Sequence, residues 1–446
     1  MEKILRAAAE QAIDMVSKQG LEGEAFLLYD RELSIEISAG QVETLKQAEQ
    51  IGLGLRVLNH GKMGFAYSSD LSSAAINEVV RNAVHISAYT SADDFNQFPA
   101  GGHVYPLMQI FDACIASTPV EEKIEIAQKV EQAARAYDKR VQVVERAGYE
   151  DSEMTVLVIN SRGLYAHGRG TYCGVHISLV AEENSDAQNG FASMVKKRIG
   201  DLLPGVVGEE AAMRAVRSLQ ARTISSGRMP CILEPYVMTR FMGLLSSSVQ
   251  ADAVQKGKSL LADKVGRQVA SRELTLIDDA SYEDGIASFP FDGEGVPAQK
   301  NIVIENGELK GFLYDTYSGL KAGRHSSGNG VRGTFRSLPG VGATNFMLVP
   351  GQASPAELLG DIERGFYITD VMGMHTANPI SGDFSLGAAG IMIEQGKLTY
   401  PVRGVTIAGN LLNLLMDIEA VGNDLRFFGG KAASTIRLQN LSVGGH

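Results

Sequence analysis

The polar residues best suited to chemistry in this chain lie in one short segment, Met374–Asp383. It holds His375, Asn378, Ser381 and Asp383 within ten residues. An imidazole and a carboxylate can transfer protons, which makes His375 and Asp383 the candidate catalytic residues. Together with Asn378 and Ser381 they are also candidates for binding a substrate. The alternative is a purely structural turn, because Asn-Pro and Ser-Gly are strong turn dipeptides whose side chains often satisfy the backbone.

A catalytic zinc ion is not expected in this chain. Such a site needs about three nitrogen, sulfur or carboxylate ligands, and two histidines about one helical turn apart usually provide two of them. The eight histidines never pair in this way, since none is closer than nine residues to another: His60, His85, His103, His167, His176, His325, His375 and His446. The three cysteines include no C-x-x-C pair, so neither a thiolate zinc site nor a disulfide framework is indicated.

Two further segments carry charged residues that must be weighed as ligand sites. One is an acidic neighbourhood whose spacing matches no EF-hand loop, so we expect a solvated acidic rim rather than a cation site. Its members are Asp278, Asp279, Asp284, Asp292 and Glu294. The other is the glycine-rich loop 323–333, with Arg324 and Arg332. It lacks the Walker pattern, so we expect a mobile loop or a lid rather than a phosphate site.

The elements that must position these residues alternate between helices and short strands. The periodicity predicts a helix over residues 2–19 and then antiparallel strands between residues 24 and 68, with a hairpin turn at 59–62. Further helices are expected over 70–88, with Asp70 as the cap, and over 119–137 and 209–222. After residue 225 short apolar strands are too closely spaced for βαβ crossovers. We therefore predict an α+β protein with mostly antiparallel sheets, in two domains: residues 1–224 and a β-rich C-terminal domain, residues 225–446.

Composition excludes several classes of function. The formal net charge is −11, from 41 Lys and Arg against 52 Asp and Glu. Such a surface repels phosphate backbones, so nucleic-acid binding is not expected. No run approaches the roughly 20 apolar residues of a membrane span, and the first residues form an amphipathic helix rather than a signal peptide. We expect a protein of the cytoplasm, without a membrane partner.

Several blocks of the second half match a known family in order and spacing. They are the segment 371–415, Asp-Gly-Glu-Gly-Val-Pro at 292–297, Ile-Glu-Asn-Gly-Glu-Leu-Lys-Gly at 304–311, Gly-Asn-Gly at 328–330, Val-Gly-Asn-Asp at 421–424 and the closing segment 438–445. The chain resembles the TldD/PmbA peptidases, once labelled modulators of DNA gyrase. In that family the TldD branch holds zinc through an H-E-x-x-x-H helix and a late cysteine. This chain has neither of the two.

The family pattern indicates which residues replace the zinc ligands. Gly243, Leu244 and Ser248 stand where the first His, the general-base Glu and the second His would stand, and Gly429 replaces the cysteine of the late turn. The resemblance therefore implies the PmbA/TldE branch: a subunit with no metal or other cofactor of its own, non-catalytic alone. Its implied partner is a zinc-bearing TldD-like subunit, and the implied substrates are unstructured peptides that the pair degrades or matures.

Two alternatives remain open at this point. The chain is a self-sufficient peptidase that acts as a homodimer through an unconventional site such as His375 and Asp383, or it is a non-enzymatic protein that binds and regulates a partner. A pseudo-symmetric heterodimer implies a surface that also suits homodimerisation, so the sequence does not rank the two assemblies.

Overall fold

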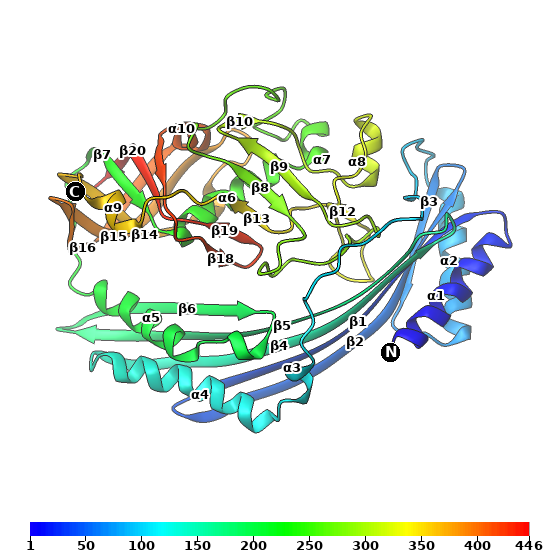
Figure 1. The fold of residues 1–446 in the computed structure, drawn as a ribbon, viewed down its shortest axis with the longest axis horizontal. Coiled ribbons are helices and arrows are strands. Elements are labelled where there is room, and N and C mark those ends of the chain that lie inside the picture. Colours follow the sequence, from blue (N-terminus) through cyan, green and yellow to red (C-terminus); the bar gives the residue numbers. More distant parts are fainter. Residues whose placement is uncertain (446) are drawn as a thin grey trace.

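The first half of the chain forms one long, curved antiparallel sheet (Figure 1). This computed structural model describes residues 1–445. The sheet has six strands in the order β3-β2-β1-β4-β5-β6. Their bounds are β1 Glu22–Ser38, β2 Gln41–Asn59, β3 Lys62–Ser68, β4 Val141–Asn160, β5 Tyr165–Glu183 and β6 Asp186–Lys196. All neighbouring strands in this sheet are antiparallel, and β3 and β6 are its two edge strands.

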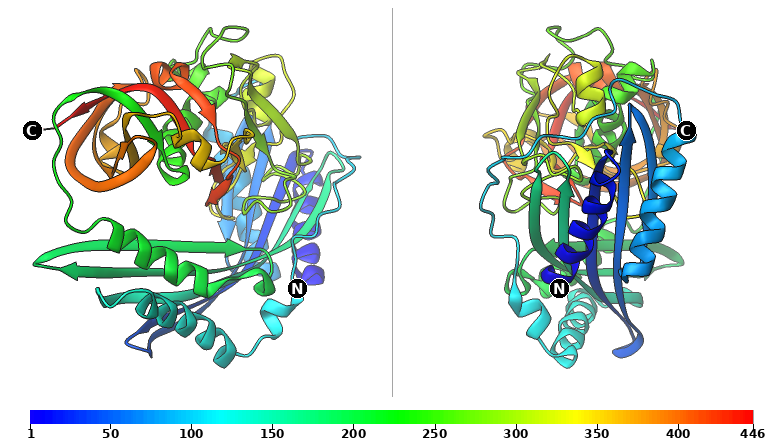
Figure 2. Two further views of the ribbon diagram at one scale, coloured as in Figure 1. Left: turned by 60° about the vertical axis from the view of Figure 1, so that its left-hand side comes forward. Right: turned by 90° about the vertical axis from the view of Figure 1, so that its right-hand side faces the viewer.

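Helices cover the outer face of this sheet in two groups. The helices are α1 Glu2–Ser17, α2 Ser73–Tyr89, α3 Ala113–Ser117, α4 Val120–Tyr137 and α5 Pro204–Arg217, with the 3-10 turn η1 Ile199–Asp201. Figure 2 shows α1 and α2 along one end of the sheet and α4 and α5 along the other. Side chains alternate between the two faces of a strand. In β1, Ala25 and Leu27 therefore pack with α1 and α2, whereas Phe26 and Leu28 face the second half of the chain.

Most sequence-based predictions for these elements are confirmed. The hairpin between β2 and β3 turns through His60 (φ 49°) and Gly61 (φ 78°), the positive pair that a type I′ turn requires. The cap of α2 was predicted wrongly. Ser72 is the N-cap, and Asp70 instead accepts hydrogen bonds from the backbone and hydroxyl of Ser72. The helix expected over 209–222 also lies earlier, because Pro204 begins it.

The second half contains two more six-stranded sheets. One has the order β10-β9-β8-β13-β19-β18, and the other has the order β16-β15-β14-β7-β20-β17, with β16 also pairing with β20 so that the sheet closes on itself. The strands are β7 Gly227–Leu233, β8 Leu276–Asp279, β9 Lys300–Glu305, β10 Glu308–Leu309, β11 Gly330–Val331, β12 Gly340–Val341, β13 Phe346–Leu348, β14 Arg364–Met372, β15 Asp383–Glu394, β16 Lys397–Asn410, β17 Ile418–Val421, β18 Arg426–Phe428, β19 Lys431–Ala433 and β20 Ile436–Gly444. The predicted α+β class, with mostly antiparallel sheets, is confirmed.

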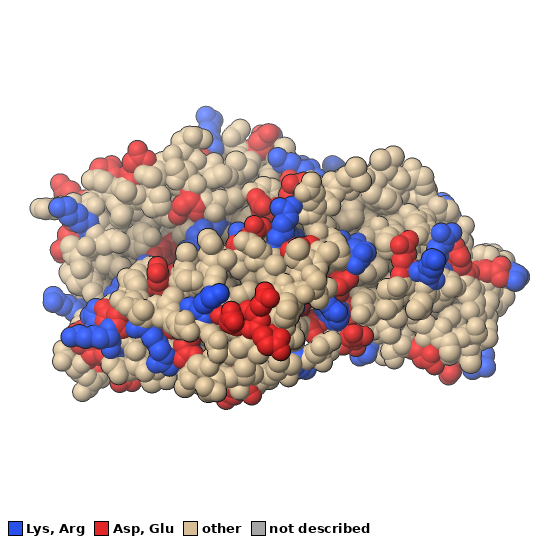
Figure 3. Space-filling model, turned by 60° about the horizontal axis from the view of Figure 1, so that its bottom comes forward, with Lys and Arg blue, Asp and Glu red and all other residues tan. Residues whose placement is uncertain are grey.

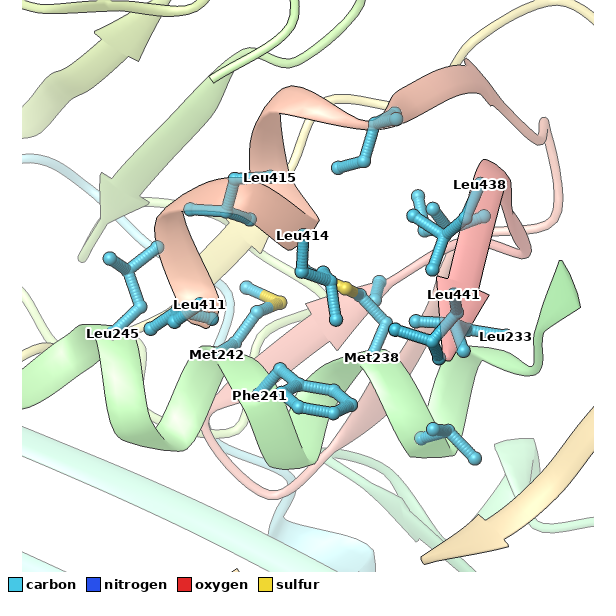
Figure 4. Packing of buried hydrophobic residues seen from close by; sticks show 14 of the residues in the cluster. Leu233, Met238, Phe241, Met242, Leu245, Leu411, Leu414, Leu415, Leu438 and Leu441 are labelled. Atoms are coloured by element: carbon cyan, nitrogen blue, oxygen red, sulfur yellow. The ribbon is translucent and has the colours of Figure 1, made fainter. Parts of the chain in front are cut away.

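Helix α6, Pro235–Ser248, is the centre of the second half. The other helices are α7 Ala251–Gln255, α8 Thr316–Lys321, α9 Pro355–Leu359, α10 Leu411–Met416 and the 3-10 turn η2 Met374–Thr376. Figure 4 shows Phe241, Met242 and Leu245 of α6 packed toward Leu411 and Leu415 of α10. Leu233 of β7 and Leu438 and Leu441 of β20 lie to the right in this view, near Met238. This apolar face of α6 is almost completely buried, so the core fixes the orientation of the whole helix.

Along the chain, the boundary between the two halves lies between β6 and β7. The last strand of the first sheet ends at Lys196, and the first strand of the other sheets begins at Gly227. The domain limits at residues 224 and 225 stay a prediction. None of the helices within residues 1–445 is long and apolar enough to cross a membrane.

Candidate functional site

Helix α6 and the β18–β19 hairpin meet at the positions that the sequence pattern assigned to a lost metal site. Gly243 is exposed on α6, and a Cβ built on it would lie 3.7 Å from Cε of Lys431. Gly429 forms the turn of the hairpin with φ +60°. The ring of Tyr236, at the start of α6, stacks edge-on against Phe428 with centroids 5.3 Å apart. The structure thus brings together two segments that lie far apart in the sequence.

The side chains at the other two positions on α6, Leu244 and Ser248, point into the protein interior and not toward an open site. Leu244 packs against the main core. Ser248 is fully buried, and its hydroxyl donates to the carbonyl of Pro379 at 3.4 Å. The end of α6 therefore contacts the polar loop 374–383 directly. An aliphatic and a hydroxyl side chain therefore lie where the sequence pattern places the general base and the second histidine.

The polar side chains of loop 374–383 are exposed and mostly bind within the loop. Asn378 accepts hydrogen bonds from the backbone of Ile380 and Ser381, at 2.9 and 3.1 Å. The hydroxyl of Ser381 donates to Asp383 at 2.8 Å, and Asn410 Nδ2 donates to Asp383 at 2.9 Å. These bonds from Asn410 and Ser381 lower the pKa of the Asp383 carboxyl. His375 lies on η2 with its side chain exposed.

A groove of about 630 Å³ runs between the two halves of the molecule. Its walls come from edge strand β6 and helix α5 on one side and from strands β14 and β16 on the other; they include Gln188, Asn189, Phe191, Thr369, Met372, Val402 and Gly404. Tyr236 also lines the groove, and its contact with Phe428 places this end beside the α6–hairpin corner. A groove of this size can hold several residues of an extended peptide.

The arginines that line the groove are paired. Arg217 bridges to Glu234 at 2.7 Å and Arg403 to Asp186 at 2.8 Å. Arg214 bridges to a glutamate of α5 and also donates to the carbonyl of Phe191 at 2.9 Å, so the backbone of edge strand β6 accepts a side-chain donor. The arginines of the groove therefore have carboxylate or backbone partners and do not create a positive field. Charges of both signs are also interspersed over the face shown in Figure 3.

Comparison with known proteins decides the family. Three domain models of the PmbA/TldA metallopeptidases match: domain 1 over residues 23–87, the central domain over 115–219 and the C-terminal domain over 226–445. The metalloprotease PmbA of Escherichia coli O157:H7 is 30% identical over 99% of this chain and 96% of its own length. The chain belongs to the PmbA/TldD metallopeptidase family. The resemblance seen in the sequence is confirmed.

Solved structures show that the PmbA/TldD fold extends over the whole chain. A Thermotoga maritima protein named as a modulator of a DNA gyrase is 30% identical, with a TM-score of 0.92 over 98% of this chain and 100% of the other. TldE from Thermococcus kodakarensis is 23% identical, with a TM-score of 0.90 over 98% of this chain and 100% of the other, and it supports the fold alone.

The zinc ion that the PmbA/TldD family implies does not fit the residues present here. A zinc site takes thiolate, imidazole or carboxylate ligands. The corner between α6 and the hairpin offers Gly243, Leu244, Ser248 and Gly429 instead, and the aliphatic part of Lys431 lies beside Gly243. Within residues 1–445 no group of three His, Cys, Asp or Glu side chains is arranged to hold a metal ion.

The prediction of a solvated acidic rim is wrong for this PmbA/TldD chain, apart from the exposed Asp284. Glu294 is buried and pairs with Arg56 of β2 at 3.0 Å. Asp278 is buried too and accepts from Asn329 Nδ2 at 2.6 Å. The expectation of a mobile lid is likewise wrong for the end of the glycine-rich loop, where Arg332 is buried and pairs with Glu24 at 2.6 Å. Each charge is compensated by a group that the local sequence does not show.

Proposed function

We propose that this chain is the subunit without zinc in a two-subunit peptidase of the TldD/TldE type. A TldD-like partner holds the zinc ion, and the pair degrades or matures unstructured peptides in the cytoplasm. The corner between α6 and the β18–β19 hairpin supports this proposal, because the sequence pattern aligns Gly243, Ser248 and Gly429 with the family's metal ligands and Leu244 with its general base. The names of the relatives, which include metalloproteases PmbA and TldD, support the same class of activity.

The groove between the two halves supplies a physical role for such a subunit. An extended peptide offers a main-chain donor and acceptor at each residue, and a free sheet edge can bind them with little preference for sequence. Strand β6 has β5 on one side only, and residues 187–191 of β6 line the groove. Loop 374–383 lies at the end of α6, where His375, Asn378, Ser381 and Asp383 provide polar groups for the same peptide.

The experiment that tests this proposal is peptide hydrolysis by purified chains. An unstructured peptide and azocasein are incubated with this chain alone, with an H-E-x-x-x-H relative alone and with the mixture, each with and without a chelator. Bound zinc is quantified on each chain. We expect hydrolysis by the mixture, loss of hydrolysis with chelator, and zinc on the relative only.

Two other outcomes would contradict the proposal. Chelator-insensitive hydrolysis by this chain alone would mean that it is a peptidase in its own right. A complex whose rate equals that of the zinc-bearing relative alone would reduce this chain to a regulatory or binding protein. Size-exclusion chromatography of the same samples separates the heterodimer from a homodimer.

A further inference from the structure

An apolar cavity of about 240 Å³ lies near the end of β6, where the inner face of the first sheet meets the C-terminal half. Its apolar wall combines side chains from β1, β4 and the loop between β8 and β9: Phe26, Met154, Val156, Ile286, Phe289 and Phe291. The rings of Phe289 and Phe291 pack edge to face, with centroids 5.0 Å apart. Phe26, Val156 and Phe291 also belong to a buried cluster that joins the two halves, so packing fixes this wall before any ligand arrives.

The charged residues of the cavity wall are engaged by the protein itself. The side chain of Arg332 has no exposed surface and pairs with a buried glutamate. Both oxygens of Asp292 accept backbone N–H groups, at 2.8 to 3.0 Å. The ammonium of Lys197 donates to the carbonyl of Ile286 at 2.8 Å, which holds the loop between β8 and β9 against the end of β6. The surface that remains for a ligand is therefore mainly apolar.

Strand β6 connects this cavity to the groove. Its residues 187–191 line the groove, while Lys197, directly after its last residue, lines the cavity. Phe191 and Lys197 are six positions apart, about 20 Å along an extended strand, and an even separation puts both side chains on the same face. No strand within residues 1–445 pairs with the free edge of β6. An extended peptide on that edge would therefore pass both the groove and the cavity.

The groove end of this path offers both backbone and apolar contacts. The carbonyl of Phe191 accepts from Arg214 and so points away from β5; the backbone groups of Asn189, two residues earlier, face the same open edge. The side chains of Phe191 and Met372, on β6 and β14, line the groove and are 52% and 53% exposed. Large apolar side chains left exposed in a groove are typical of a binding surface.

We propose that a peptide held along β6 places two bulky apolar side chains six residues apart, one in the groove beside Phe191 and Met372 and one in the apolar cavity. A strand that pairs with β6 advances by the same rise per residue, so this spacing puts both side chains on the inner face. The cavity can take an aromatic ring, because about 150 Å³ already holds benzene. This inference rests on the proposed peptidase role and defines its substrates as unstructured peptides with that apolar spacing.

The test measures binding by the full chain alone, through the fluorescence anisotropy of labelled peptides, so it needs no zinc-bearing partner. The peptides are otherwise composed of Ser, Thr and Gly. They carry two Phe residues six positions apart, two Phe residues five positions apart, a single Phe, or none. A spacing of five would turn one ring to the opposite face of the strand. We expect the spacing of six to bind about tenfold more tightly than the spacing of five or the single Phe.

A variant links this preference to the cavity. Ala287 is exposed and lines the cavity, so Ala287→Trp fills the space with little cost to the core. We expect the Kd of the peptide with a spacing of six to rise about tenfold, to that of the single-Phe peptide. The single-Phe peptide can still use the groove, so its Kd should be unchanged. Ala322→Trp is the matched control, because Ala322 is exposed and lines neither space; it should leave every Kd unchanged.

Three results would overturn this inference: equal affinity for the spacings of six and five, no binding of any peptide, or unaltered affinity in folded Ala287→Trp. Urea unfolding shows whether the variant is folded; if it is not, the comparison of spacings on the native chain decides. Hydrolysis of the same peptides by the two-subunit complex separates the two proposals. Hydrolysis that ignores the spacing removes this inference and leaves the peptidase role. Spacing-dependent binding without hydrolysis removes the peptidase role and leaves the two apolar sites.

Discussion

Arg332 Nη2 lies 2.6 Å from Glu24 Oε1, although 308 residues separate the two in the chain. Both side chains are fully buried. Arg56 joins the same cluster through Glu24 at 2.7 Å and Glu294 at 3.0 Å. Two arginines and two glutamates thus connect strands β1 and β2 with two loops of the second half. The cluster links the curved sheet to the C-terminal half. Separating these buried charges would cost several kcal/mol, about 3–5 for one broken pair.

Breaking this cluster should destabilise the fold. Glu24→Gln removes one charge and leaves Arg332 buried without a carboxylate, so we expect a loss of about 3–5 kcal/mol in the free energy of unfolding. Urea denaturation followed by circular dichroism measures it. The control is Arg403→Ala, which breaks a pair to Asp186 whose arginine is half exposed. A loss no larger than that of the control would show that the buried cluster contributes little.

The contribution of Lys197 to stability should rise with pH above 8. Its pKa falls from 10.5 to about 8 on folding, so between these values the unfolded chain binds more protons than the folded one. Unfolding then becomes less favourable as pH rises, by up to about 3 kcal/mol across that window. The variant Lys197→Met lacks this pH-dependent contribution to the free energy of unfolding. The difference in unfolding free energy between the variant and the native chain should therefore shrink between pH 8 and 10.5, and a constant difference would contradict the prediction.

Gly243 should tolerate a side chain, because its position holds no structural role that requires glycine. A Cβ there meets only Lys431 Cε, at ordinary contact distance. Gly243→Ala should stabilise α6 by about 0.5–1 kcal/mol. Gly208 is the matched control within α5, where a Cβ would lie 2.2 Å from the carbonyl oxygen of Val130. Gly208→Ala should destabilise by ~1–3 kcal/mol. Thermal unfolding of both variants measures the contrast.

Loop 374–383 should matter for turnover by the two-subunit complex. His375→Ala changes an exposed side chain, so we expect a native melting temperature and a fall of roughly tenfold in kcat/KM, the effect of losing one substrate hydrogen bond. Asp383→Ala should lower turnover as well, while removing the bonds from Ser381 and Asn410. If both variants unfold, the loop is a structural turn only. If they remain folded with native kinetics, these residues do not bind the peptide.

Filling the groove should raise KM in the same complex. Ala187 is exposed on β6 and lines the groove. Ala187→Trp places an indole where an extended peptide would lie, so we expect KM to rise by on the order of tenfold with little change in kcat, as for a loss of binding alone. Ala187→Ser tests the position without adding bulk and should leave KM unchanged. Native kinetics in Ala187→Trp would remove the groove from the peptide path.

The sequence by itself determined the features that depend on local patterns. The type I′ turn at His60 and Gly61, the span of α4 and the α+β class all follow from spacing and turn chemistry within short windows. The family also follows, because it rests on ordered blocks of residues. The replacement of the zinc-binding pattern by Gly243, Leu244 and Ser248 can be read in the same way.

Tertiary structure alone decided which charges are buried and where the groove lies. Asp292, Glu294 and Arg332 appeared to belong to solvated loops because charged residues are rarely buried unless they are paired. The partners of Glu294 and Arg332 are Arg56 and Glu24, each more than 200 residues away in the chain. No local pattern encodes such a pair, since it arises only when the curved sheet closes over the C-terminal half. The groove forms between the same two halves, and for that reason the sequence alone did not reveal it.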